Sequence, residues 1–135
     1  MARELALTTL YSLDFHKVIY ENPEFEEFPT LTDEEREALN PETVIFAKYL
    51  LAGTLEHLKE IDSMITKYSI NRPLDKIDII DRNILRMSIF SLLYDKDIPS
   101  HVVITEGVRL SQEYSREVNY KFINGILDSM EKQLR

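Results

Sequence analysis

The chain has 135 residues and a formal net charge of −8, with 16 Lys and Arg against 24 Asp and Glu. We expect residues 1–135 to form one domain, because this length suffices for a hydrophobic core. The absence of cysteine excludes disulfides and thiolate zinc sites, and it fits a reducing cytoplasm. No apolar run approaches the ~20 residues of a membrane span. Arg3 and Glu4 at the start argue against a signal peptide.

The acidic excess lies in the first half of the chain. Residues 1–68 contain 6 Lys and Arg against 14 Asp and Glu, whereas residues 69–135 contain 10 of each kind. An acidic surface repels nucleic acid at long range. Any site for nucleic acid is therefore expected to be local, in the neutral second half together with the extreme N-terminus.

Apolar residues recur at helical spacing along the chain, and no alternation is long enough for a β-strand. The first predicted helix has two apolar stripes and continues to Val18, after which residues 22–29 break it. Thr32 followed by Glu35 has the spacing of a capping box, which predicts the start of a short helix.

Asn40 before Pro41 is a strong signal for a helix start. The apolar face that follows continues for about 25 residues and predicts the longest helix, ending near Tyr68. After a connector at residues 71–73, three more helices are expected, at about Asp78–Tyr94, Ser100–Tyr114 and Val118–Gln133. Helices joined by such short connectors predict an all-α fold, a single compact bundle of about six to seven helices.

The helix expected at residues 78–94 is apolar over most of its surface, so we expect it to be central and contacted from several directions. Gly107 lies inside the helix that follows. A glycine in a helix interior costs about 1 kcal/mol relative to alanine. We therefore expect a neighbouring helix to approach closely at Gly107.

The residues that usually carry catalysis or metal binding are scattered. His16, His57 and His101 lie on different predicted helices without metal-ligand spacing. No phosphate-binding glycine loop and no nucleophile elbow is present. Asp78 and Asp81 are interpreted as first-turn acids that the helix dipole stabilises. We therefore expect no enzyme, no metal and no cofactor.

The last predicted helix has a core side formed by Ile123, Leu127 and Met130. Phe122 lies about 100° from the centre of that side, and Lys121 lies nearly opposite it. Phe122 then has two interpretations. Its ring is the margin of the core, or it is a platform on which a single-stranded base stacks while Lys121 holds a phosphate. Such stacking contributes about 1–3 kcal/mol per base.

Several short strings stand in an order and spacing typical of one known family. They are A-R-E at Ala2–Glu4, L-Y at Leu10–Tyr11, D-R-N-I-L-R-M at Asp81–Met87, D-I-P at Asp97–Pro99, V-I-T-E-G-V at Val103–Val108 and K-F-I-N-G-I-L-D at Lys121–Asp128. Together they resemble the NusB family of bacterial antitermination factors.

The resemblance implies an all-helical bundle of two packed subdomains that acts as an adapter. Such an adapter binds the single-stranded boxA sequence of nascent RNA together with the small ribosomal protein NusE. With other Nus factors it helps hold RNA polymerase in a termination-resistant state, chiefly on ribosomal RNA operons. Carried over by position, the candidates to face RNA are Arg3, Tyr11, Tyr114, Lys121 and Phe122. Those to face NusE are Lys76 and Asp81.

The chain departs from the family pattern in three places. The family usually carries an arginine-rich arm before A-R-E, whereas only Met1 and Ala2 precede Arg3 here. Fewer phosphate contacts lower the affinity for RNA and its salt dependence, so we expect weak unaided binding. Arg72 takes the place of a Trp before the Asp81 helix, and Gly107 stands where the family prefers Ala.

Two alternatives stay open at this point. One is an RNA-docking domain related to rRNA cytosine methyltransferases, which would require a cofactor domain beyond Arg135. The other is a helical interaction protein that has lost RNA binding, an interpretation favoured by the isoelectric point of about 4.9. The sequence also leaves open whether two copies form a homodimer.

Overall fold

The computed structural model describes residues 1–22, 24–25, 27–70 and 72–135. Within these residues the chain forms seven α-helices, one short 3-10 helix and no strand, which confirms the predicted all-α fold. The elements are α1 (Ala2–Phe15), α2 (Asp33–Glu37), α3 (Pro41–Glu56), α4 (Leu58–Tyr68), η1 (Leu74–Lys76), α5 (Ile79–Tyr94), α6 (Ser100–Tyr114) and α7 (Tyr120–Leu134). None of the described helices has the length and apolar character needed to cross a bilayer.

Local signals place the starts of α2 and α3 where the sequence predicts them. The Thr32 hydroxyl accepts a hydrogen bond from the Glu35 amide, and the Glu35 carboxylate accepts one from the Thr32 amide, which completes the capping box. The Asn40 side chain accepts from the Glu42 amide at 2.8 Å, with Pro41 at the first helical position. The predicted break at 22–29 and connector at 71–73 include residues 23, 26 and 71, which lie outside the described residues.

The prediction of one long helix up to Tyr68 is wrong, because the helix divides at His57. His57 leaves the helical region with φ −106° and ψ 19°, so that α3 ends at Glu56 and α4 starts at Leu58. The His57 ring stacks on Tyr94 with 4.0 Å between ring centroids. The spacing of apolar residues stays helical across the break, so the hydrophobic periodicity of the sequence could not predict it. The first helix likewise ends at Phe15 instead of Val18, since Lys17 adopts a left-handed conformation with φ 61°.

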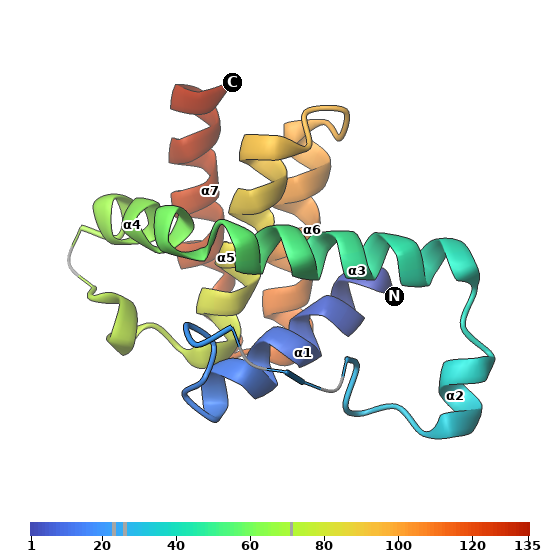
Figure 1. Cartoon of the computed structure of the whole chain (residues 1–135). Coiled ribbons are helices and arrows are strands. Elements are labelled where there is room, and N and C mark those ends of the chain that lie inside the picture. Colours follow the sequence, from blue (N-terminus) through green and yellow to red (C-terminus); the bar gives the residue numbers. More distant parts are fainter. Residues whose placement is uncertain (23, 26, 71) are drawn as a thin grey trace.

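Helix α5 is the centre of the bundle, as its apolar composition predicts. Every residue from Asn83 to Leu92 is buried. Helices α1 and α3 pack on α5 and on each other, and α6 and α7 do the same. In Figure 1, α5, α6 and α7 stand side by side, while α3 crosses in front of α5 and α6 and leads into α4 near α7. The two packed halves of the fold thus share α5.

Two glycines allow helices to approach closely. A Cβ atom on Gly53 of α3 would lie 2.1 Å from Cζ of Phe90, so the Phe90 ring occupies the space of a side chain. A Cβ atom on Gly107 would lie 3.1 Å from both Leu127 Cδ1 and Ser88 Oγ. The close approach predicted at Gly107 is therefore confirmed.

A buried ionic network ties α1 and α4 to α5. Arg86 is 1% exposed, and its guanidinium donates to Asp62 at 2.8 and 3.0 Å and to Asp14 at 2.8 Å. Arg82 adds two hydrogen bonds to Asp14, at 2.6 and 2.7 Å. Burial by itself raises the pKa of Asp14, but the hydrogen bond from Arg82 and the charge of Arg86 hold that pKa below its ordinary value.

We predict that Asp14→Asn lowers the free energy of unfolding by about 1.5–3 kcal/mol near pH 7, because Arg86 loses a charged acceptor. Since the pKa of Asp14 is depressed in the folded state, its contribution is present above the ordinary pKa of about 3.8 and is lost as the pH falls through the folded value. Urea unfolding of both proteins from pH 7 down to pH 3 should show the difference narrowing below about pH 4. A difference that stays constant over this range would contradict the assignment.

Candidate RNA-binding surface

The residues predicted to face RNA gather mainly in two surface grooves. Tyr11 and Tyr114 line one of about 390 Å³, between α1 and the end of α6. Lys121 and Phe122 line a second of about 380 Å³, between the end of α4 and the start of α7. We refer to these as the α1–α6 groove and the α4–α7 groove. Arg3 lines neither of them.

The α1–α6 groove is apolar and aromatic. The rings of Tyr11 and Phe15 stack with 5.8 Å between centroids and 16° between planes. Phe15 is 59% exposed and Tyr114 is 48% exposed, so both rings present large surfaces to solvent. The described lining contains no carboxylate; it comprises Leu7, Thr8, Tyr11, Ser12, Phe15, His16, Pro29, Thr30, Ile80 and Tyr114. Stacked rings at a surface suit an unstacked base.

The hydroxyl of Tyr114 stays protonated near neutral pH. Burial raises the pKa of Tyr114, and the negative charges of Glu4 and Glu113 raise it further. A hydrogen bond to the Glu113 carboxylate also raises the pKa of Tyr114, so Tyr114 contributes its ring to the α1–α6 groove while its hydroxyl is engaged by Glu113. Phe15 was not predicted as a site residue, although its position four residues after Tyr11 places both rings on one helix face.

The α4–α7 groove combines aromatic rings with cations. Its described lining comprises Tyr68, Ser69, Ile70, Arg72, Lys121, Phe122, Gly125 and Ile126. Lys121 is exposed. Phe122 is half-buried and packs against the main core, while the Arg72 guanidinium carbon lies 4.2 Å from its ring centroid. This half-buried position fits the interpretation of Phe122 as the margin of the core, and base stacking on its exposed part stays a prediction.

The loop at residues 115–119 links the two grooves, because it follows Tyr114 directly and leads into α7. The carboxylate of Asp81 on α5 holds this loop. It accepts hydrogen bonds from Ser111 Oγ at 3.0 Å, Ser115 Oγ at 2.8 Å and Asn119 Nδ2 at 2.7 Å. Asn119 also donates to Asp78 at 2.7 Å. The start of α5 therefore fixes the position of α7, and with it Lys121 and Phe122.

The structure gives Asp81 a different setting from the partner-facing one expected. Asp81 is 2% exposed, and its carboxylate is occupied by the three donors of α6 and the following loop. It is therefore placed to position the surface and not to touch a partner directly. Lys76, at the end of η1, is exposed, and its role in protein binding stays a prediction.

Arg3 is held by contacts within the chain. Its guanidinium lies 3.4 Å from a Glu106 carboxylate oxygen and 5.3 Å from the centroid of the Phe46 ring. The side chain is 19% exposed. The role of Arg3 in RNA binding stays a prediction, because Arg3 lines neither of the two grooves.

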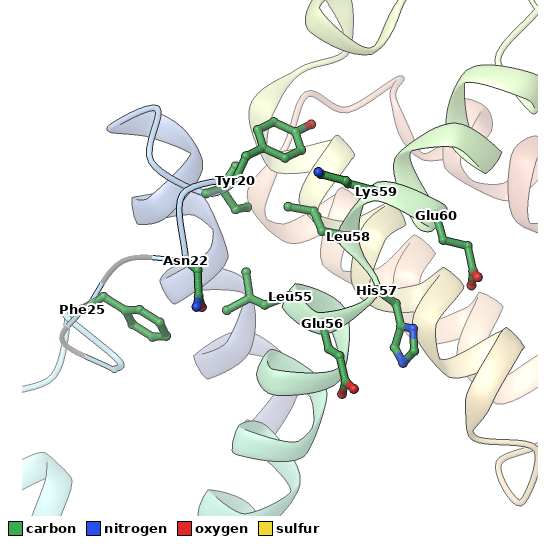
Figure 2. Close-up of a pocket in the computed structure, with 10 residues that line it drawn as sticks. Tyr20, Asn22, Phe25, Leu55, Glu56, His57, Leu58, Lys59 and Glu60 are labelled. Atoms are coloured by element: carbon green, nitrogen blue, oxygen red, sulfur yellow. The ribbon is translucent and has the colours of Figure 1, made fainter.

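A further cavity, of about 430 Å³, lies at the junction of α3 and α4. Figure 2 shows Asn22 and Phe25, from the loop after α1, facing Leu55 near the end of α3. Its lining includes both Glu56 and Lys59, so it has no consistent charge for an anionic ligand. It contains none of the predicted site residues.

The described residues contain no group of three or more His, Asp or Glu placed to hold a metal ion. The linings of the two grooves offer aromatic faces, and the α4–α7 groove adds the positive charges of Arg72 and Lys121. That set matches the chemistry of an unpaired nucleotide, which has a flat base and an anionic phosphate.

We predict that Asp81→Ala lowers the free energy of unfolding by about 1–3 kcal/mol, because it removes the acceptor of the buried Ser111 hydroxyl and of the half-buried Ser115 hydroxyl, and one of the acceptors of Asn119. Asp78→Ala serves as the matched control, since the Asp78 side chain is 43% exposed and its change should cost clearly less. Urea denaturation measures both. Equal stability of Asp81→Ala and the wild type would mean that this carboxylate does not hold the loop.

Comparison with known proteins gives consistent matches. The family model described as NusB family matches residues 1–132. The transcription antitermination protein NusB of Thermodesulfovibrio yellowstonii is 38% identical over 136 aligned residues, covering 98% of this chain and 90% of that protein. The protein of the same name from Myxococcus xanthus is 40% identical over 126 residues, covering 93% of this chain and 89% of its own length.

Solved structures agree with these matches. A NusB structure from T. maritima superposes with a TM-score of 0.82 at 29% identity, covering 98% of this chain and 89% of that one. A chain from the crystal structure of the antitermination factors NusB and NusE in complex with dsRNA superposes with a TM-score of 0.78 at 29% identity, covering 98% of this chain and 94% of its own.

Proposed function

The chain belongs to the NusB family, and on that premise we propose that it is an RNA-binding antitermination factor. It binds boxA RNA of nascent ribosomal transcripts together with the ribosomal protein NusE, and through this complex and other Nus factors it acts on RNA polymerase. The similarity to a chain from a structure that holds NusB, NusE and dsRNA supports the partnership with NusE and RNA, and the grooves of this chain are the basis for proposing a single strand.

The proposal extends to the class and setting of the protein. It is a binding module and not an enzyme, in keeping with the name that its relatives share. It acts as one domain, since the family match runs from residue 1 to residue 132. It works in the cytoplasm, where nascent bacterial transcripts are made. The alternative of a methyltransferase docking domain gains no support from relatives that are named antitermination proteins and match over about nine-tenths of their length.

The two grooves support a single-stranded RNA. In a duplex, bases are stacked on each other and unavailable to side-chain rings, whereas an unpaired strand can place its bases on aromatic surfaces. Tyr11, Phe15 and Tyr114 provide such surfaces in the α1–α6 groove, and Phe122 with Lys121 provides a ring and a cation in the α4–α7 groove.

A partner is needed because the body of the protein is acidic. A net charge of −8 opposes the approach of RNA at long range, and only a few cations line the grooves. Bound NusE would supply additional RNA contacts that this chain lacks. The RNA strand is then held by two weak sites at once, one on this chain and one on NusE, and the two together bind it more tightly than either alone.

We predict that the protein alone binds labelled single-stranded boxA RNA weakly, and at least about tenfold more tightly when NusE is bound, since the second contact becomes intramolecular. Titrations at one fixed salt concentration, with and without NusE, measure the gain. A duplex of the same sequence is the control and should gain less. If NusE produces no gain with either RNA, the adapter function is not supported, and the alternative of a helical protein that has lost RNA binding is favoured.

We predict that Phe122→Ala weakens binding of the NusE complex to boxA RNA by about 1–3 kcal/mol through lost stacking. Phe122→Leu is the matched variant, because leucine keeps apolar contact with the core but offers no ring. Both RNA affinity and urea stability are measured. Loss of affinity in both variants supports stacking. A Phe122→Leu protein with wild-type affinity would show that the ring serves packing alone.

A further inference from the structure

We propose that the α4–α7 groove is a nucleotide pocket in which Arg72 is a principal RNA-binding residue and Gly125 leaves room for the bound nucleotide. The pocket takes one unpaired nucleotide of the RNA strand, whose phosphate lies between Arg72 and Lys121. This inference rests on the proposed function and gives Arg72 and Gly125 roles in RNA binding that the resemblance did not imply.

The charge of the groove is the first argument. Its described lining contains two cations, Arg72 and Lys121, and no carboxylate, in a chain that has 24 Asp and Glu. A third cation, Lys67, lies with its ammonium nitrogen 5.7 Å from the ring centroid of the lining residue Tyr68. A local concentration of positive charge on an acidic protein offsets the repulsion that RNA meets elsewhere.

The partners of the arginines are the second argument. In the described part of the chain, every other arginine side chain contacts a carboxylate or a backbone carbonyl oxygen. The Arg72 guanidinium instead lies over the Phe122 ring at 4.2 Å, with no acceptor among the described residues. A guanidinium stacked on a ring keeps its N–H donors directed outward along its edges. Arg72 thus presents unused donors at the groove.

The backbone around Arg72 is held in place before any ligand binds. The Arg72 amide donates to the Ser69 carbonyl at 2.7 Å, and the Ser69 hydroxyl donates to the Arg72 carbonyl at 2.8 Å. Ser69 is 5% exposed, so this reciprocal pair is anchored to the body of the protein. Ordering the residue in advance reduces the entropy lost on binding.

Gly125 is a glycine inside a helix although no neighbouring atom would exclude a larger side chain there. A Cβ atom added there would have no heavy atom within 4 Å, in contrast to 2.1 Å at Gly53 and 3.1 Å at Gly107. Glycine inside a helix costs about 1 kcal/mol relative to alanine. The position lines the groove, so the open space at Gly125 is available to a ligand.

The nucleotide that fits is single-stranded. Tyr68 offers ring surface for a base, together with the part of the Phe122 ring that Arg72 and the core leave exposed, and Arg72 offers both hydrogen bonds to the base edge and charge for the phosphate. In a duplex the base would be paired and stacked, so it could not enter a groove of about 380 Å³.

The test uses the full chain with NusE bound and labelled single-stranded boxA RNA as probe. Gly125→Ala, the matched control, should keep the affinity within about twofold, because a methyl group fills little of the groove, and should unfold at higher urea. Gly125→Glu should weaken RNA binding at least about tenfold, since it places a carboxylate in the groove. Gly125→Gln, neutral and of the same size, separates lost space from repulsion.

Arg72 is tested with two substitutions at an exposed position where folding is not at risk. Arg72→Gln should weaken RNA binding about 5- to 50-fold and reduce the salt slope by about 0.7, the value for one phosphate contact with a single strand. Arg72→Lys should keep the salt slope but recover only part of the affinity, because lysine lacks the planar donor set.

The outcomes separate this inference from the proposed function. If the wild-type complex binds no boxA RNA, the proposed function fails, and this inference with it. If the wild type binds but Arg72→Gln and Gly125→Glu bind equally well, the pocket is overturned and the function stands. If either variant weakens NusE binding measured without RNA, the groove serves the protein partner and the inference is wrong.

Discussion

The burial of α5 is the constraint on which the rest of the structure depends. A helix that is enclosed from Asn83 to Leu92 must satisfy any polar group that it carries inside the core. Arg86 does so by taking a carboxylate from α1 and another from α4, Asp14 and Asp62. Because these hydrogen bonds are directional, they set how α1 and α4 lie on α5, which apolar packing alone specifies less narrowly.

The N-terminal end of α5 also determines part of the protein surface. Asp81, one turn into α5, holds the loop between α6 and α7, and the first turns of α7 present Lys121 and Phe122. A polar cluster inside the fold therefore determines where a cation and a ring meet solvent. Residues that touch no ligand can affect RNA binding through this geometry.

An acidic protein that binds RNA must confine its positive charge to a few places. Most arginines of the described chain are neutralised within the fold, as Arg82 and Arg86 are by Asp14. Arg72 and Lys121 are exposed and line the same α4–α7 groove, whose described lining contains no carboxylate. In the proposed complex this arrangement forms a local site, and we expect its affinity for RNA to stay modest unless a second protein adds contacts.

Sequence alone determined what depends on neighbouring residues along the chain. The capping box at Thr32, the start of a helix at Asn40, the buried character of α5 and the grouping of Lys121 with Phe122 all follow from local spacing. Only the tertiary structure decided the break at His57, the burial of Asp81 and the placement of Arg72 on Phe122, because each depends on residues far away in the chain. Helical periodicity records which side of a helix is apolar, but it does not record which helix or side chain will meet that side.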